Sequence, residues 1–225
     1  MASIIQKIAT KLNLYSKDKE ATELRYWKIK KQEEKQLNNT HYQYFYTEHF
    51  GLTNDFYKDK KILDIGCGPR GSLEWADMAR ERVGLDPLAN EYLRLGANEH
   101  KMRYLASYSE DIPLDDYYFD VVCSFNSIDH VEDLPKTCSE IDRVLKPGGT
   151  LLLLVDIHDH PTICEPQIIT WDFMKVYFSM YKILAQSHYE KKERGMYESV
   201  RKQVLFDHQN SDKRYGILSV MAKKS

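Results

Sequence analysis

From residue 61 onward the sequence alternates between short apolar runs and longer stretches with helical periodicity. The runs are Lys61–Ile65, Arg82–Leu85, Met102–Ala106, Phe119–Ser124 and Thr150–Asp156. Runs rich in leucine and β-branched residues predict strands, and helices between them predict parallel pairing with right-handed connections. The alternation therefore predicts a doubly wound α/β fold with a mostly parallel sheet.

The last part of the chain has a different pattern. Runs of strand character cover Tyr181–Tyr189, Gln203–Asp207 and Tyr215–Ala222, with little helix between the last two. Short connections join antiparallel strands, so we expect an antiparallel C-terminal edge strand on the sheet.

Residues 1–57 are rich in lysine and tyrosine, with one glycine and no proline. The pattern predicts a short amphipathic helix near Ile4–Leu12, a second over Asp18–Leu37, and a third from Thr40, as N-cap, to Phe50. The rings of the third helix suit core packing, and equally suit the wall of a ligand pocket. We therefore divide the chain into a helical lid (1–57) and a main domain (58–225).

Charge and cysteine content narrow the function classes. Lys and Arg number 32 against 34 Asp and Glu, which gives no overall field for nucleic acid or anionic lipid. The longest apolar run, Leu151–Val155, is too short to span a bilayer, and Lys7 and Lys11 interrupt the N-terminal apolar pattern. Four scattered cysteines form no C-x-x-C pair, so we expect reduced thiols in a cytoplasmic protein that binds neither nucleic acid nor membrane.

A glycine turn after the first strand indicates a ligand site. Asp64 comes before Gly66, Cys67 and Gly68, and we expect a helix to begin near Ser72. Glycines at such a turn let the backbone approach a ligand closely, and the G-x-G-x-x-G spacing is shared with nicotinamide enzymes. An acid this close would repel a pyrophosphate but suits a cationic group. Asp86, followed by Pro87, ends the next strand, where a carboxylate can accept hydrogen bonds from ribose hydroxyls.

These motifs and three others resemble those of class I S-adenosylmethionine-dependent methyltransferases. The further motifs read Ser-Glu-Asp-Ile-Pro-Leu, Phe-Asp-Val-Val through Asp-His-Val, and Glu-Ile-Asp-Arg-Val-Leu-Lys-Pro-Gly-Gly, and together the five span residues 61–156. The resemblance implies a Rossmann-like fold and S-adenosylmethionine as cofactor. It assigns cofactor contacts to these residues: Asp64, Gly66, Cys67, Gly68, Asp86, Pro87, Ser109, Glu110, Asp111 and Asn126. Tyr108-Ser109 departs from the Asp-Ala pair common in the family, so Tyr108 packs either on the adenine or in the core.

Three histidines follow the fourth and fifth strands, at the sheet edge where ligands bind. His130, His158 and His160 are the candidate catalytic residues, as a general base or as a clamp for the acceptor. Their spacing with Asp156 and Cys164 matches no standard zinc pattern, so no metal site is predicted. Arg70 either reaches an anionic ligand or stays solvated. Trp171, Phe173 and Tyr177 begin a helix that either roofs the pocket or packs on the sheet.

The motifs leave several functions open. We expect methyl transfer to a small-molecule acceptor, with oxygen preferred over nitrogen or carbon and with hydroxyl and carboxylate both open. The Ser124-Phe-Asn-Ser turn lacks the N/D-P-P-aromatic pattern of many nitrogen-directed enzymes. The alternatives are a nicotinamide-dependent oxidoreductase and a catalytically silent relative that serves as a partner subunit.

Overall fold

The computed structural model describes residues 4–39, 41–162, 164–212 and 215–225, with side chains from Lys19 onward. Its strands are β1 Lys61–Ile65, β2 Glu81–Leu85, β3 Arg103–Leu105, β4 Phe119–Phe125, β5 Leu145–Ile157, β6 Lys182–Glu190 and β7 Gly216–Lys223. The helices are α1 Ile4–Glu34, α2 Gln43–Tyr46, α3 Ala89–Arg94, α4 Leu134–Val144, α5 Phe173–Tyr177 and α6 Met196–Lys202. Single 3-10 turns are η1 Glu48–Phe50, η2 Asn54–Tyr57, η3 Gly68–Arg70, η4 Ala97–Glu99 and η5 Ile128–His130.

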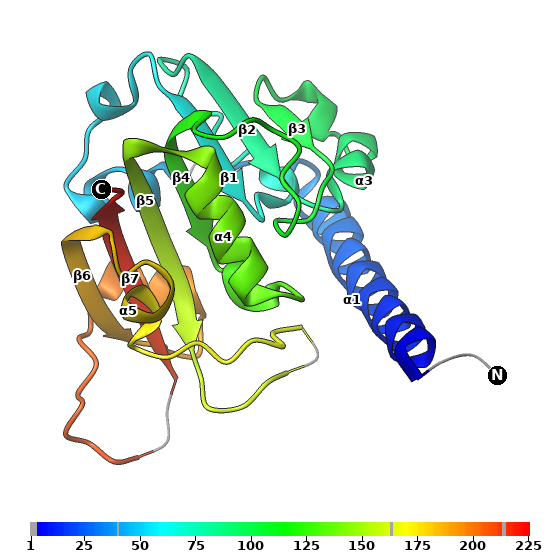
Figure 1. The fold of residues 1–225 in the computed structure, drawn as a ribbon. Helices are drawn as coiled ribbons and strands as arrows, with labels where there is room; N and C mark the ends of the chain where they lie inside the picture. Colours follow the sequence, from blue (N-terminus) through cyan, green and yellow to red (C-terminus); the bar gives the residue numbers. More distant parts are fainter. Residues whose placement is uncertain (1–3, 40, 163, 213–214) are drawn as a thin grey trace.

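The described strands form one sheet in the order β3-β2-β1-β4-β5-β7-β6 (Figure 1). β1 to β5 are mutually parallel, as the alternation predicts. β7 is antiparallel to both β5 and β6, which confirms the antiparallel C-terminal strand. β7 lies one position inside the edge, because β6 pairs on its outer side.

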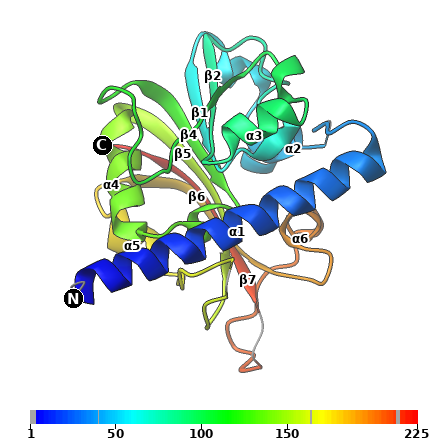
Figure 2. The ribbon, with the colours of Figure 1, turned by 90° about the vertical axis from the view of Figure 1, so that its right-hand side faces the viewer.

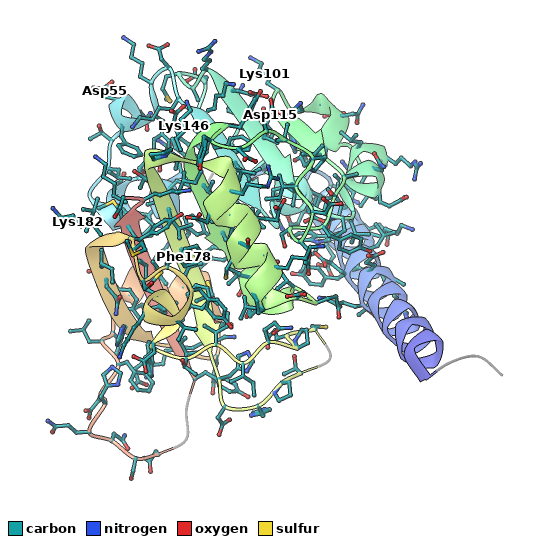
Figure 3. All side chains as sticks on the ribbon, viewed as in Figure 1. Asp55, Lys101, Asp115, Lys146, Phe178 and Lys182 are labelled. Carbon is teal, nitrogen blue, oxygen red and sulfur yellow. The ribbon has the colours of Figure 1, made fainter. Side chains whose placement is uncertain are left out.

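Two faces of the sheet carry separate cores. One face packs under α4 and α5, with Leu63, Val122, Ile141 and Phe173 among its buried side chains. Figure 3 places Phe178 beside α5 on this face. The other face packs against α2, η1 and α6 through Phe45, Ile62 and other apolar residues. The sheet is therefore covered on both sides, as a parallel sheet requires.

The N-terminal region differs from its prediction. One helix, α1, replaces the first two predicted helices and runs across the molecule between α3 and α6 (Figure 2). The third predicted helix is divided into α2 and η1, and Gly51 ends η1 at φ 68°. The predicted N-cap Thr40 lies outside the described residues. No helix in the described part of the chain is both long enough and apolar enough to cross a membrane.

Two other sequence predictions are wrong. The helix expected from Ser72 is a series of turns, and Arg82 donates to the carbonyls of Leu73 and Glu74, where helical N–H groups would otherwise bond. The strand expected at Gln203–Asp207 is loop after α6, with one bridge from Leu205 to Tyr189. Cys67, Cys123, Cys138 and Cys164 are free, as predicted.

Candidate active site

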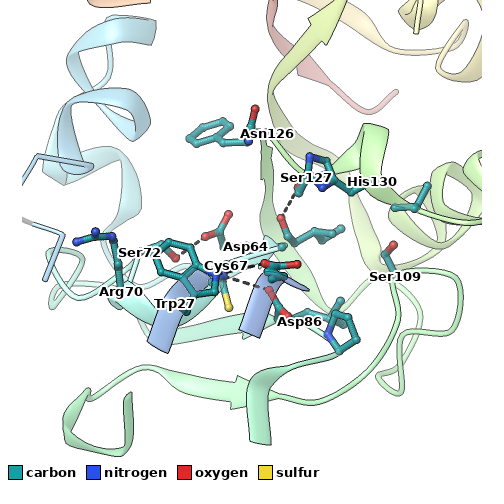
Figure 4. A pocket seen from close by; sticks show the side chains of 18 of the residues that line it. Trp27, Asp64, Cys67, Arg70, Ser72, Asp86, Ser109, Asn126, Ser127 and His130 are labelled. Atoms are coloured by element: carbon teal, nitrogen blue, oxygen red, sulfur yellow. Dashed lines mark hydrogen bonds between the residues drawn. The ribbon is translucent and has the colours of Figure 1, made fainter. Parts of the chain in front are cut away.

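A cavity of about 520 Å³ opens at the carboxyl ends of β1, β2 and β4, with α1 across it. This size is typical of small-ligand sites. The predicted site residues that line it are Asp64, Gly66, Cys67, Gly68, Asp86, Pro87, Ser109, Glu110, Asn126 and His130. Figure 4 shows Asp64, Asp86 and Ser127 arranged around this space. The fold therefore brings together residues from four separate motifs.

The glycine turn is closely packed, and at Gly66 it has no space for a side chain. Gly66 and Gly68 adopt φ values of 70° and 58°, which favour glycine. A Cβ on Gly66 would lie 2.2 Å from the Cβ of Ser127, whose hydroxyl donates to the Ile65 carbonyl at 2.7 Å. The Trp27 ring of α1 packs over Gly68, 3.5 Å from where a Cβ would stand. The turn is thus pressed between the loop after β4 and α1.

Cys67 has a packing role in this turn. Its side chain is buried, and its Sγ lies 2.6 Å from where a Cβ on Gly84 of β2 would stand. Burial raises the pKa of the thiol well above its ordinary value, so Cys67 stays protonated. It follows that the side chain supports the turn from beneath, and that a ligand would contact Cys67 through its backbone.

Asp64 is held by two hydroxyl groups. Tyr46 donates to Oδ2 at 2.9 Å, and Ser72 donates to the same oxygen. Burial raises the pKa of Asp64 to about 7, although these two hydrogen bonds oppose the shift. Because both donors use Oδ2, Oδ1 is the oxygen left for a ligand in the cavity. A buried carboxylate of this kind is stabilised by a cationic partner.

Asp86 lies at the end of β2 beside a second acid that the sequence motifs did not reveal. The Asp86 carboxylate accepts from the backbone N–H groups of Leu88 at 2.9 Å and Gly68 at 3.2 Å. Burial, and then the nearby Glu23 of α1, raise the pKa of Asp86 to about 7. Tyr92 and the Trp27 indole both donate to Glu23 Oε1, at 3.0 and 3.3 Å. Two acids therefore meet where hydroxyl donors of a ligand would be bound.

The acidic turn after β3 is only partly in the cavity. Ser109 and Glu110 line it, whereas Asp111 is exposed and lies outside it. Glu110 Oε1 accepts from the backbone N–H groups of Glu132 and Asp133, at 2.8 and 3.1 Å, which fixes this turn to the loop before α4. Tyr108 also lines the cavity, and its hydroxyl donates to Glu20 of α1.

Of the three candidate catalytic histidines, the structure brings His130 to the cavity. Burial, with a smaller contribution from Lys19, lowers the pKa of His130, so the ring is neutral near pH 7. His158 and His160 lie outside the cavity, in the loop after β5, where His160 is 3.0 Å from the hydroxyl of Tyr215. The residues Trp171, Phe173 and Tyr177 also lie outside it and pack on the sheet. The short α5 follows the sheet face, which separates this segment from the cavity.

Several lining residues were missed by the sequence motifs. They are Lys19, Glu20, Glu23, Tyr26 and Trp27 of α1, His41 after it, Ser127, and Tyr197 of α6. Glu23 and Trp27 are four residues apart and so lie on one helix face, but this spacing does not tell which surface the helix covers. In the aromatic segment after α1, Tyr42 and Tyr46 line the cavity, whereas Phe45 and Phe50 are core residues. The segment therefore serves both as core packing and as pocket wall.

Arg70 proves to be a contact between the glycine turn and α1. Its guanidinium donates to both carboxylate oxygens of Glu34, at 2.8 and 2.7 Å, and to the Asn38 carbonyl at 3.0 Å. It also stands 5.5 Å from the Trp27 ring centre. The residue is neither solvated nor free for a ligand; it joins the C-terminal end of α1 to the cavity wall.

Comparison with known proteins identifies the domain. Residues 63–153 match the family described as a methyltransferase domain. This match and the seven-stranded fold support a class I S-adenosylmethionine-dependent methyltransferase domain over these residues, and S-adenosylmethionine is the cofactor of that class.

Individual relatives share only part of their length with this chain. Tocopherol O-methyltransferase of Arabidopsis thaliana is 30% identical over 51% of this chain and 35% of its own length. Sterol 4-C-methyltransferase strm-1 of Caenorhabditis elegans is 32% identical over 44% and 32%. Geranyl diphosphate C-methyltransferase of Streptomyces coelicolor A3(2) superimposes with a TM-score of 0.59 at 17% identity, over 82% of this chain and 76% of its own. The chain thus spans about a third of the length of these curated relatives.

Proposed function

We propose that this protein transfers the methyl group of S-adenosylmethionine to an oxygen atom of a small molecule with an aromatic or apolar body. The observation that carries the proposal is one cavity that continues from the glycine turn to a wall of aromatic rings beneath α1. Methyl transfer needs the acceptor in line behind the sulfonium methyl, and a shared cavity brings the two molecules together.

The cofactor half of the proposal uses the strand ends. The free oxygen of Asp64 faces the methionine ammonium, and Asp86 with Glu23 accepts hydrogen bonds from the ribose. The buried carboxylates favour a cationic ligand over a diphosphate, because a diphosphate would add negative charge beside them. Pro87, Ser109 and Glu110 lie where the adenine would extend.

The acceptor half combines rings with one cation. Tyr42, Tyr46, Phe125 and Tyr197 supply apolar wall. Lys19 is 15% exposed, and its ammonium donates to the His130 carbonyl. An ammonium has three donors, so others are free to hold an oxygen anion. We therefore assign Lys19 and the His130 ring to positioning an anionic oxygen, such as a carboxylate or phenolate, which needs no general base.

In this proposal residues 1–57 act as a lid. Four contacts hold α1 in place: Glu34 with Arg70, Glu20 with Tyr108 and Lys19 with His130 at the cavity wall, and Glu23 with Tyr92 of α3. A lid that supplies cavity residues excludes water when it closes, which favours a charged methyl donor meeting its acceptor.

Two measurements test the proposal. Calorimetry with S-adenosylhomocysteine should show saturable binding at one site, with no saturable binding of NADH. Incubation with methyl-labelled S-adenosylmethionine and matched phenols, carboxylic acids and amines of one ring size should label the oxygen acids, detected by mass spectrometry. Labelling of the amines alone would refute the oxygen assignment, and saturable NADH binding without S-adenosylhomocysteine binding would refute the cofactor.

A further inference from the structure

A second group of polar side chains lies behind His130, outside the cavity. Asp129 and His130 belong to η5, and Glu165 belongs to the loop after β5; their ligand atoms all lie within 4.8 Å of one another. His158, at the end of β5, places its Nε2 4.0 Å from Glu165 Oε2. Two segments that follow neighbouring strands thus bring two carboxylates and two imidazoles together.

Three of these side chains carry buried polar atoms that make no hydrogen bond within the described residues. Asp129 is 0% exposed, and neither of its carboxylate oxygens has a donor. The same is true of Nε2 of His130 and of Nε2 of His158, the latter on a side chain that is 4% exposed. A buried polar atom left unpaired is costly, so this concentration indicates a missing partner that attracts both carboxylate oxygen and imidazole nitrogen.

The tautomer of His158 shows which kind of partner is needed. Its Nδ1 lies 2.6 Å from the His160 carbonyl, which can only accept, so Nδ1 carries the proton. In the neutral ring Nε2 is then a lone pair directed toward the carboxylate of Glu165, 4.0 Å away. Two acceptors that face each other need a cation between them. A ligating histidine commonly donates its other N–H to a backbone carbonyl in this manner.

The surrounding charges also favour a cation at this site. Asp129, Glu165 and the neighbouring Asp156 contribute three carboxylates. Lys191 pairs with Asp156 through Oδ2, and Lys19 faces His130 from α1. Lys19 also approaches Glu132, at 4.0 Å, and so does not neutralise the two remaining acids. A divalent cation would balance Asp129 and Glu165.

We propose that Asp129, His130 and Glu165 bind one divalent transition-metal ion, with Zn²⁺ as the best match, and that His158, which faces Glu165, completes its shell. Two imidazoles and two carboxylates suit a four-coordinate ion of this type, whereas Mg²⁺ prefers oxygen ligands. No zinc spacing is visible in the sequence because the ligands come from η5 and the loop after β5, which only the sheet order brings together.

The ion would join the loop after β5 to the wall of the cavity. Gln167 in this loop already bonds the backbone of η5 and the residues after it, through Asp129 O at 3.2 Å and Val131 O at 3.0 Å. The His130 ring is 29% exposed and lines the cavity, while its Nε2 is buried toward Asp129 at 3.8 Å. Bound metal therefore fixes the ring that positions the acceptor, without entering the cavity itself.

Metal binding alone tests this site and does not depend on methyl transfer. The full chain, treated with EDTA and desalted, is titrated by calorimetry with ZnSO₄, MnCl₂ and MgCl₂ in separate runs. We expect one Zn²⁺ per chain, weaker Mn²⁺ and no saturable Mg²⁺ binding. X-ray absorption at the zinc edge should show only nitrogen and oxygen ligands at about 2.0–2.1 Å. Absence of saturable Zn²⁺ binding by the wild-type chain, or sulfur in its shell, would overturn the proposal.

Variants separate this site from other histidines. Asp129→Asn and His158→Gln should each weaken Zn²⁺ binding by about 10-fold or more. The matched control is His208→Gln, because His208 and His188 form an exposed pair 2.8 Å apart that offers zinc a competing site. Loss of binding in His208→Gln, with Asp129→Asn and His158→Gln unchanged, would refute the assignment. Far-UV circular dichroism of each variant confirms that it is folded before titration.

Discussion

The two walls of the cavity are built in different ways. The wall at the strand ends consists of backbone turns and acids that stand together in short sequence motifs, such as Asp64 and Gly66, with Ser127 packed against them. The wall formed by α1 consists of side chains, including Glu23 and Trp27, that meet partners far away in the chain and belong to no motif. The first wall can therefore be recognised from short motifs, whereas the second is defined by tertiary contacts alone. The variants Gly66→Ala and Asp86→Asn alter the first wall, and Glu34→Gln alters the second.

The largest effect is expected in the glycine turn. Gly66→Ala should abolish detectable S-adenosylhomocysteine binding, because the new Cβ would overlap Ser127 at 2.2 Å. Gly51→Ala is the matched control, since Gly51 has nearly the same φ (68° against 70°) but nothing within 4 Å of the added atom. Calorimetry compares the two. Equal affinities in both variants would mean that close packing of the turn does not matter.

A smaller loss is expected at Asp86. Asp86→Asn should weaken S-adenosylhomocysteine binding by about 1–3 kcal/mol, or roughly 5- to 150-fold, because an amide cannot accept two ribose hydroxyls with both of its ends. Asp77→Asn, in the exposed part of the turns after β1, should bind like the wild type. Unchanged affinity in Asp86→Asn would place the ribose elsewhere.

The same variant should gain stability in the absence of cofactor. The pKa of Asp86 is about 7 in the folded chain, against an ordinary value of 3.8. Between these two pH values, the folded chain therefore holds a proton on Asp86 that the unfolded chain has lost. Stability from this group is present below pH 4 and is lost as the pH rises to 7, by up to about 1.4 kcal/mol per pH unit. The carboxylates of Glu23 and Asp64 face Asp86, and their negative charge also raises its pKa. Thermal melts from pH 5 to 8 should therefore fall less steeply for Asp86→Asn than for the wild type, and parallel curves would contradict this.

The smallest effect is expected at the end of α1. Glu34→Gln removes one charge of the pair with Arg70, an exposed contact worth about 0.2–1 kcal/mol. We expect faster amide hydrogen exchange over residues 19–34 and an acceptor KM raised at most about 5-fold, with S-adenosylhomocysteine affinity unchanged. Glu33→Gln is the control, because Glu33 pairs with Lys30 on the same helix. Identical exchange in the two variants would show that the pair does not hold α1.

The difference between the walls also explains what the sequence could predict. The sequence predicts Lys61–Ile65 at its observed bounds, and the alternation predicts the parallel pairing of β1 to β5, because both depend on local pattern. Asp64 and Asp86 could be placed at the site because the carboxyl ends of parallel strands share one edge. The turns after Gly71 could not be predicted, since they depend on Arg82 capturing two carbonyls.

Contacts between distant segments limit what the sequence can predict. Glu23 reaches Tyr92 across 69 residues, and nothing near either residue predicts the pair. His158 was singled out for its residue type, but its surroundings depend on how the loop after β5 folds back on η5. Periodicity identified α1 as helical without revealing that it is continuous or which surface it covers.

The position of β7 has a consequence for synthesis of the chain. β7 is the one strand that neighbours β6 in the described sheet, apart from the single bridge of Tyr189 to Leu205, and β7 is made after every other strand of the sheet. While the ribosome adds the intervening residues, β6 has no neighbour and the outer side of β5 is open. Exposed strand edges promote association between nascent chains. The growing polypeptide thus passes through a stage at which β6 is an unpaired strand for chaperones to protect. That stage ends when β7 inserts between β5 and β6.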